Sequence, residues 1–121
     1  MIVADASVLI AYLDRSDPHH DEAIDVIAGV EHFVVHPLTL AEVLVHPVRL
    51  GREAEVMARL EAVGMMTTGI TINSIELARI RVESGLKLPD CVVLLAARTL
   101  SLPVATFDTK LGAAAGGRGG T

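Results

Sequence analysis

Short apolar runs alternate along the chain with longer segments in which apolar residues recur at helical spacing. The apolar and β-branched runs predict strands at residues 1–4, 32–36, 65–72 and 103–106. Helical spacing predicts helices at residues 7–13, from residue 18 onward, and at 38–46, 50–63, 74–85, 90–100 and 107–115.

Proline, glycine and capping residues set the expected ends of these helices. Pro47 is expected to end the third helix, and Gly64 the fourth. Asn73 or Ser74 is expected to cap the fifth. The second helix is expected to bury one face, formed by Ala23, Ile24, Ile27 and Ala28.

The order of the elements predicts an α/β sandwich with a mainly parallel central sheet, because strands alternate with helices along the chain. Strands in parallel sheets are buried on both faces, which fits the continuously apolar runs. We expect one domain over residues 1–115, followed by a flexible glycine-rich tail at 116–121.

Composition narrows the class of protein. The chain is 51% apolar and 21% charged, which excludes intrinsic disorder for its body. The longest apolar run, residues 91–97, is too short for a membrane-spanning helix, and the start lacks the features of a secretory signal. The single cysteine, Cys91, excludes an internal disulfide and a thiolate zinc site. We therefore expect a cytoplasmic protein.

The charge and the aromatic content limit how the chain could bind nucleic acid. Aromatic residues make up 2% of the sequence, too few for a sheet on which several bases stack. The net charge is −5, whereas passive nucleic-acid binders are usually basic. A nucleic acid would therefore need a local basic patch or bound cations.

Four acidic residues stand where the predicted fold places functional sites. Asp5 and Asp108 follow the first and last strands, Asp90 begins a helix that is apolar almost all round, and Glu42 lies on the helix after the second strand. In open α/β sheets, sites lie beyond the carboxyl ends of the strands. We therefore expect these carboxylates to share one crevice.

Each acid also has a purely structural explanation. The three aspartates are well placed as helix N-caps, a role worth about 1 kcal/mol each. Glu42 shares a helix face with Thr39 and His46, which is typical of an ordinary solvated stripe.

The combination of the four acids favours a metal site. Carboxylates converging within about 5 Å repel by roughly 3 kcal/mol per pair at an effective dielectric constant of 20. Protons or cations must neutralise them, so at least one carboxylate should have a raised pKa when no metal is bound. Oxygen ligands suit Mg²⁺ or Mn²⁺, whose charge would also offset that of the protein.

Three segments resemble a known family. They read MIVADASVLIAYLD at residues 1–14, LAEVL at 40–44, and LPDCVVLLAARTLSLPVATFD at 88–108. Together they resemble the PIN-domain family, and within it the VapC-type toxin ribonucleases of bacterial toxin–antitoxin systems. The chain departs from the family pattern at Cys91, where a smaller residue is expected, and at Phe107, where a polar one is common.

The resemblance implies a PIN-like three-layer α/β/α sandwich and a set of site residues. Asp5, Asp90 and Asp108 would hold Mg²⁺, with Mn²⁺ able to substitute, and Glu42 would complete the catalytic cluster. Ser7 would hydrogen-bond beside Asp5, and Thr106 would support Asp108.

The resemblance also implies partners. Similar toxins are homodimers that cut RNA endonucleolytically, often transfer or ribosomal RNA, and a cognate antitoxin peptide occludes their active-site groove. The leading hypothesis is therefore a Mg²⁺-dependent endoribonuclease in which water attacks the phosphodiester. The products would carry 5′-phosphate and 3′-hydroxyl ends.

Two other functions remain open. A non-catalytic protein of the same fold would bind an antitoxin or RNA without cleaving it. A phosphotransfer enzyme of the haloacid dehalogenase type would use Asp5 as its nucleophile, but such enzymes have a second aspartate where this chain has Ser7.

Basic residues and histidines give weaker signals. No pair of histidines has the close spacing of a zinc site, and His46 is of interest only because it shares a face with Glu42. Most basic residues are expected to lie on solvated faces, with one or two contacting phosphate. The candidates are Arg49, Arg52, Arg59, Arg79, Arg81, Lys87 and Arg98.

Overall fold

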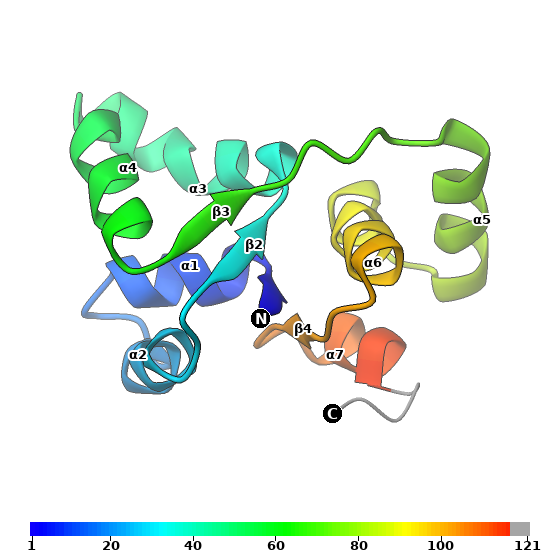
Figure 1. The fold of residues 1–121 in the computed structure, drawn as a ribbon, viewed down its shortest axis with the longest axis horizontal. Helices are drawn as coiled ribbons and strands as arrows, with labels where there is room; N and C mark the ends of the chain where they lie inside the picture. Colours follow the sequence, from blue (N-terminus) through cyan, green and yellow to red (C-terminus); the bar gives the residue numbers. More distant parts are fainter. Residues whose placement is uncertain (117–121) are drawn as a thin grey trace.

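A parallel four-stranded sheet forms the centre of the protein (Figure 1). We describe residues 1–116 of a computed structural model. The strand order is β3-β2-β1-β4, and every neighbouring pair is parallel. The strands are β1 (Ile2–Ala4), β2 (Phe33–Val35), β3 (Met65–Thr67) and β4 (Val104–Ala105).

Helices cover both faces of this sheet. Figure 1 shows α1 to α4 on one side and α5 to α7 on the other, so the predicted three-layer α/β/α sandwich is confirmed. The helices are α1 (Ala6–Leu13), α2 (His20–Ala28), α3 (Pro37–Arg49), α4 (Glu53–Ala62), α5 (Ser74–Ser84), α6 (Leu88–Leu100) and α7 (Thr109–Ala115).

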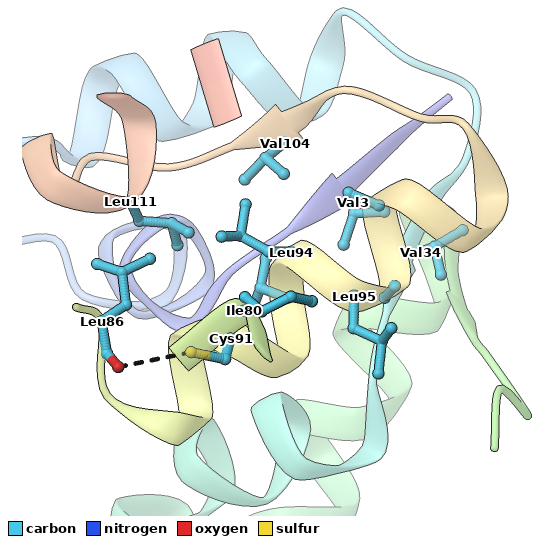
Figure 2. Packing of buried hydrophobic residues seen from close by; sticks show 12 residues of the cluster. Val3, Val34, Ile80, Leu86, Cys91, Leu94, Leu95, Val104 and Leu111 are labelled. Carbon is cyan, nitrogen blue, oxygen red and sulfur yellow. Dashed lines mark hydrogen bonds between the residues drawn. The ribbon is translucent and has the colours of Figure 1, made fainter. Parts of the chain in front are cut away.

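Alternation along the short strands divides the buried residues between two cores. Val3, Val34 and Val104 face α5, α6 and α7, as Figure 2 shows. Their neighbours Ala4 and Phe33 face α1 to α4 on the other side. Successive side chains of a strand point to opposite faces, which explains why these strands are apolar throughout.

Helix α6 is the most deeply buried helix on the side of the sheet that α5, α6 and α7 cover. Seven consecutive side chains, Cys91–Ala97, are buried, as its all-round apolar sequence predicts. The Cys91 thiol is fully buried and lies 3.5 Å from the Leu86 carbonyl oxygen, to which it donates (Figure 2). Cys91 therefore acts as a small core residue, as expected from its position.

Three predicted helix features are wrong in detail. Helix α3 continues through Pro47 to Arg49, because the ring of Pro47 is buried and only the last turn loses a hydrogen bond. Helix α4 begins at Glu53 rather than at residue 50, since Gly51 (φ 68°) turns the chain before it. In α2, Ala23 and Ile27 are buried as predicted, whereas Ile24 and Ala28 are exposed.

Helix α2 begins at His20 rather than at residue 18, and α6 begins at Leu88 rather than at residue 90. The boundaries of α5 follow the predicted caps. Asn73 caps α5 through its side chain, and Gly85 ends that helix in a left-handed conformation. Gly64 (φ 109°) ends the α4 segment, and a Cβ there would lie 2.2 Å from the Glu31 carbonyl oxygen. Strand β3 is shorter than the predicted segment, since only residues 65–67 pair with β2.

No helix within residues 1–116 is both long and apolar enough to cross a membrane. Residues 117–121 of the predicted flexible tail lie outside the described residues. The single-domain boundary at residue 115 stays a prediction.

Candidate active site

Asp5 is a buried carboxylate at the end of the central strand. Its side chain is 3% exposed, and its Oδ1 accepts the Val8 N–H at 3.1 Å, which caps α1 as predicted. Its own N–H donates to the Ala105 carbonyl at 3.2 Å, tying this end of β1 to the end of β4. Asp5 thus lies at the carboxyl edge of the sheet, where α/β proteins place their sites.

Two hydroxyl groups hold the Asp5 carboxylate. Ser7 Oγ donates to Oδ1 at 2.7 Å, and Thr106 Oγ1 donates to Oδ2. Ser7 in turn accepts the Phe107 N–H, and Thr106 accepts the Asp108 N–H, both at 2.9 Å. Each hydroxyl has a single proton, and both protons point to Asp5, so the orientation of its carboxylate is fixed.

The arrangement shows what Ser7 and Thr106 do. Ser7 lies beside Asp5, as the resemblance implies. Thr106 supports the backbone of Asp108 and also binds Asp5, a contact that the sequence did not indicate. These hydrogen bonds join segments about one hundred residues apart into one site.

Asp90 and Asp108 line an open groove of about 700 Å³. Asp108 is exposed and caps α7 by accepting the Leu111 N–H at 2.9 Å. Asp90 is half-buried and is the third residue of α6, so its predicted capping role is wrong: the N-cap is Lys87. The rest of the groove is lined by Gly85, Leu86, Lys87, Phe107, Thr109 and Lys110.

Glu42 lies in a second groove, between α1, α3 and α4. This groove has a volume of about 490 Å³ and includes His46, which shares the face of Glu42 as predicted. The residues that line this groove do not include Asp90 or Asp108, whereas the sequence led us to expect one crevice for all four acids. The remaining lining residues are Ile10, Leu13, Asp14, Val43, Pro47, Leu50, Arg52, Glu55, Val56 and Arg59.

The four acids nevertheless influence one another. Partial burial raises the pKa of Glu42, and the charges of Asp90 and Asp5 raise it further. Burial likewise raises the pKa of Asp90, with added repulsion from Asp108 and Asp5 and opposition from Lys87. The expectation that at least one carboxylate has a raised pKa is confirmed, and Asp5 is common to both interactions.

Comparison of the sequence with known protein families shows to which family the chain belongs. The sequence profile of the PIN domain matches residues 2–117. This chain belongs to the PIN-domain family. No curated protein matches the sequence.

Three solved structures share the fold. A toxin–antitoxin complex from Klebsiella pneumoniae aligns with TM-score 0.74 and 23% identity, covering 93% of this chain and 91% of that one. VapC20 of Mycobacterium tuberculosis, described as a toxin that cleaves the sarcin–ricin loop, aligns with TM-score 0.73 and 15% identity, covering 94% and 95%. PAE2754 from Pyrobaculum aerophilum aligns with TM-score 0.65 and 28% identity, covering 96% and 86%.

The acidic side chains that the structure describes in this PIN domain have the right atoms for a hard cation, but they are not spaced closely enough to hold one. Asp5, Asp90 and Asp108 offer only oxygen atoms, the ligands that Mg²⁺ prefers. Three of the roughly four acceptor positions of Asp5 are occupied, which leaves one on Oδ2. Within residues 1–116, no three Asp, Glu, His or Cys side chains lie close enough together to hold an ion. The three aspartates would therefore have to move closer together for one ion to bind.

The two grooves of this PIN domain carry different basic residues: Arg52 and Arg59 line the groove of Glu42. Lys87 and Lys110 line the groove of Asp90 and Asp108, and Lys110 was not among the predicted phosphate contacts. The sequence signal that could have identified Lys110 is its place two residues after Asp108, the N-cap of α7. Arg81 instead donates to the carbonyls of Gly85 and Leu86, which makes it part of the end of α5.

His36 controls the start of the helix that carries Glu42. Its Nδ1 accepts the Leu38 N–H at 3.1 Å, so the ring caps α3 and must be unprotonated at that atom. The side chain is 6% exposed. Burial lowers the pKa of His36, and a hydrogen bond with the backbone of Ile70 opposes this shift only in part.

This cap predicts acid sensitivity just below neutral pH. The folded pKa of His36 lies below its ordinary value of 6.5, so the unfolded chain binds more protons in that window. The stabilisation is complete above about pH 6.5 and falls as the pH decreases, by up to about 1.4 kcal/mol per pH unit. Urea unfolding between about pH 7.5 and pH 6 measures this slope.

The matched control is His36→Asn, since asparagine also caps helices but does not titrate. We expect this variant to flatten the pH dependence over the same range. An equally steep dependence in the variant would contradict the assignment to His36. Glu42 and Asp90 have raised pKa values and act in the opposite direction, and they are present in both proteins, so the comparison isolates the contribution of His36.

Proposed function

We propose that this PIN domain is a Mg²⁺-dependent endoribonuclease toxin of the VapC type, with Mn²⁺ as an alternative ion. The observation that carries the proposal is the environment of Asp5. Two hydroxyls and one backbone N–H fix its carboxylate at the edge of the sheet, within reach of the charges of Glu42 and Asp90. PIN nucleases generally use divalent metal ions, which such a group of repelling carboxylates would attract.

The proposed roles follow from these surroundings. Asp5, Asp90 and Asp108 would hold the ion, and Glu42 would complete the cluster from the adjoining groove. A bound divalent ion supplies Lewis-acid activation of water and neutralises charge on the phosphodiester. Ser7 and Thr106 keep Asp5 in one orientation. Lys87 and Lys110 would contact phosphates on either side of the cleavage site.

The experiment is cleavage of transfer and ribosomal RNA with Mg²⁺, followed by analysis of the product ends. Because water is the proposed nucleophile, we expect 5′-phosphate and 3′-hydroxyl ends. Glu42→Gln should lose most of the activity, whereas Glu61→Gln on the exposed surface of α4 should retain it. Products with 2′,3′-cyclic phosphates would contradict the mechanism.

An antitoxin peptide is the proposed protein partner. The cytoplasm is the proposed location of the protein. One similar solved structure is a toxin–antitoxin complex. The groove between α1, α3 and α4 supports this proposal, because it combines the exposed apolar side chains of Ile10 and Leu50 with Glu42. A peptide lying there would cover one member of the acidic cluster.

A homodimer is proposed through α5, the outermost helix on its side of the sheet (Figure 1). Ile75 is 66% exposed and Val82 is 84% exposed, and both line one shallow hollow on this helix with Ala78. Their spacing places them on one helix face. Exposed apolar faces of this kind mark partner surfaces.

One observation favours the non-catalytic alternative. No three acidic side chains of residues 1–116 reach ligating distance in the absence of an ion. A protein that only binds RNA or an antitoxin would need no closer approach. It would retain RNA binding in Mg²⁺ and release no fragments, so the cleavage assay separates the two functions.

A further inference from the structure

His19 and Phe107 form a stacked pair at the margin of the acidic groove. Their ring centroids are 4.5 Å apart, and the ring planes differ by 13°. Phe107 lines the groove together with Asp90 and Asp108 and is half-buried against the core of α1 to α4. The pair therefore joins the loop before α2 to the loop after β4, directly beside the proposed site.

Hydrogen bonds anchor the chain on both sides of the stack. The N–H of Phe107 donates to Ser7 Oγ, the hydroxyl that also binds Asp5. The N–H of His19 donates to Asp17 Oδ1 at 2.8 Å, and the next residue, His20, donates from Nδ1 to the Ala11 carbonyl at 2.7 Å. The stack thus has a defined position relative to the Asp5 carboxylate.

The His19 side chain is about half exposed although Phe107 stacks on its ring. Phe107 covers one face, yet 48% of the His19 side chain is exposed. The contact with Glu22 lies at a ring edge, since it involves only Nδ1 at 3.4 Å. A flat ring with a supported back and a solvated front offers a surface for stacking another flat ring.

The surroundings indicate what that ring would be. The adjoining groove carries two lysines and two aspartates, a combination that suits a phosphodiester and its cation. A base attached to that backbone would lie beside the groove. Bases within a duplex are already stacked, so only an unpaired base can offer its face.

We propose that His19, supported by Phe107, is the stacking platform for one unpaired RNA base next to the cleavage site. The inference rests on the proposed ribonuclease function and deepens it, because it restricts the substrate to single-stranded or looped RNA at this position. The scarcity of aromatic residues excludes a platform for several bases but allows one. His19 is a positioning residue, since it contacts a base and none of the reacting atoms.

The test is binding of a short single-stranded RNA that contains 2-aminopurine, whose fluorescence falls on stacking. Ca²⁺ replaces Mg²⁺ in this assay, because it takes the same kind of oxygen ligands. We expect wild-type protein to quench the probe. His19→Ala should lose the quenching and bind about tenfold more weakly, the usual range for one stacked base.

His19→Phe is the matched variant, because it keeps a flat ring on Phe107 and should retain both affinity and quenching. Binding of the same sequence as a duplex should be equal in all three proteins. In Mg²⁺ cleavage assays, His19→Ala should raise KM with little change in kcat, since stacking holds substrate and transition state alike. Melting curves of each variant report any effect on folding.

The outcomes distinguish this inference from the function on which it rests. Cleavage by wild type with equal affinity and quenching in His19→Ala would overturn the platform and leave the ribonuclease intact. Absence of both RNA binding and cleavage in wild type would overturn both. Equal weakening of duplex and single-stranded binding in His19→Ala would also overturn the platform.

Discussion

Asp90→Asn is expected to make the ion-free protein more stable and to abolish its stabilisation by Mn²⁺. The pKa of Asp90 is raised by burial and by the charges of Asp108 and Asp5, so folding disfavours its charged form at neutral pH. Neutral asparagine removes that repulsion. It also removes a proposed metal ligand, so the effects with and without metal should have opposite signs.

The expected magnitudes are large enough for a thermal melt. An ion at about one hundred times its dissociation constant stabilises a folded protein by about 2.7 kcal/mol. For a chain of this size this corresponds to a rise in melting temperature of about 10 °C. Wild type should show this rise with Mn²⁺ and Asp90→Asn should not. RNA cleavage should fall by about three powers of ten, the equivalent of about 4 kcal/mol.

Asp25→Asn is the control, because Asp25 is an exposed carboxylate on α2 outside the grooves described above. It should leave the Mn²⁺ response unchanged. A Mn²⁺ response that persists in Asp90→Asn would show that the ion binds elsewhere. A less stable ion-free Asp90→Asn protein would contradict the repulsion between the carboxylates.

Asp5→Ala is expected to be the most destabilising single change at the site. It leaves three donors without their acceptor: the buried Val8 N–H and the part-buried hydroxyls of Ser7 and Thr106. Each unpaired buried donor costs about 1–3 kcal/mol, so we expect a loss of about 3–6 kcal/mol. Relief of repulsion with Glu42 and Asp90 offsets part of it. A loss of this size is a large fraction of the stability of an ordinary domain.

Asp5→Asn provides the comparison, because both variants remove the same charge. The amide oxygen can still accept from Ser7 and Val8, so only the Thr106 hydroxyl loses its acceptor. That hydroxyl lies 3.4 Å from Ser7 Oγ and can turn its proton toward it. We therefore expect Asp5→Asn to cost about 1–2 kcal/mol, measured by urea unfolding. Equal losses in the two variants would mean that the hydrogen bonds to Asp5 contribute little.

The sequence predicted the parts of the fold that depend on local chemistry. The strands were recognisable because parallel strands buried on both faces are apolar throughout, as in β1 and β2. Asn73 and Gly85 marked the ends of α5 by their own conformational preferences. Pro47 misled because its ring is buried inside α3, and tertiary burial outweighs one missing hydrogen bond.

The candidate site was predictable in its acids but not in its arrangement. Placing Asp5 and Asp108 at strand ends followed from topology alone. The groove around Glu42 depends on how α3 packs against α1 and α4, which no local pattern reveals. The stack of His19 on Phe107 joins loops almost ninety residues apart, so it has no signature in sequence spacing.

The hydrogen bonds from the Ser7 and Thr106 hydroxyls to Asp5 also determine at which point of translation the site can form. Asp5 and Ser7 are translated about one hundred residues before Thr106, Phe107 and Asp108. A ribosome that is still synthesising this chain therefore carries an incomplete site, with the central strand lacking its β4 neighbour. The proposed nuclease is silent toward the ribosome that makes it until β4 and the loop after it have emerged. That interval allows a partner translated alongside it to be present before the site closes.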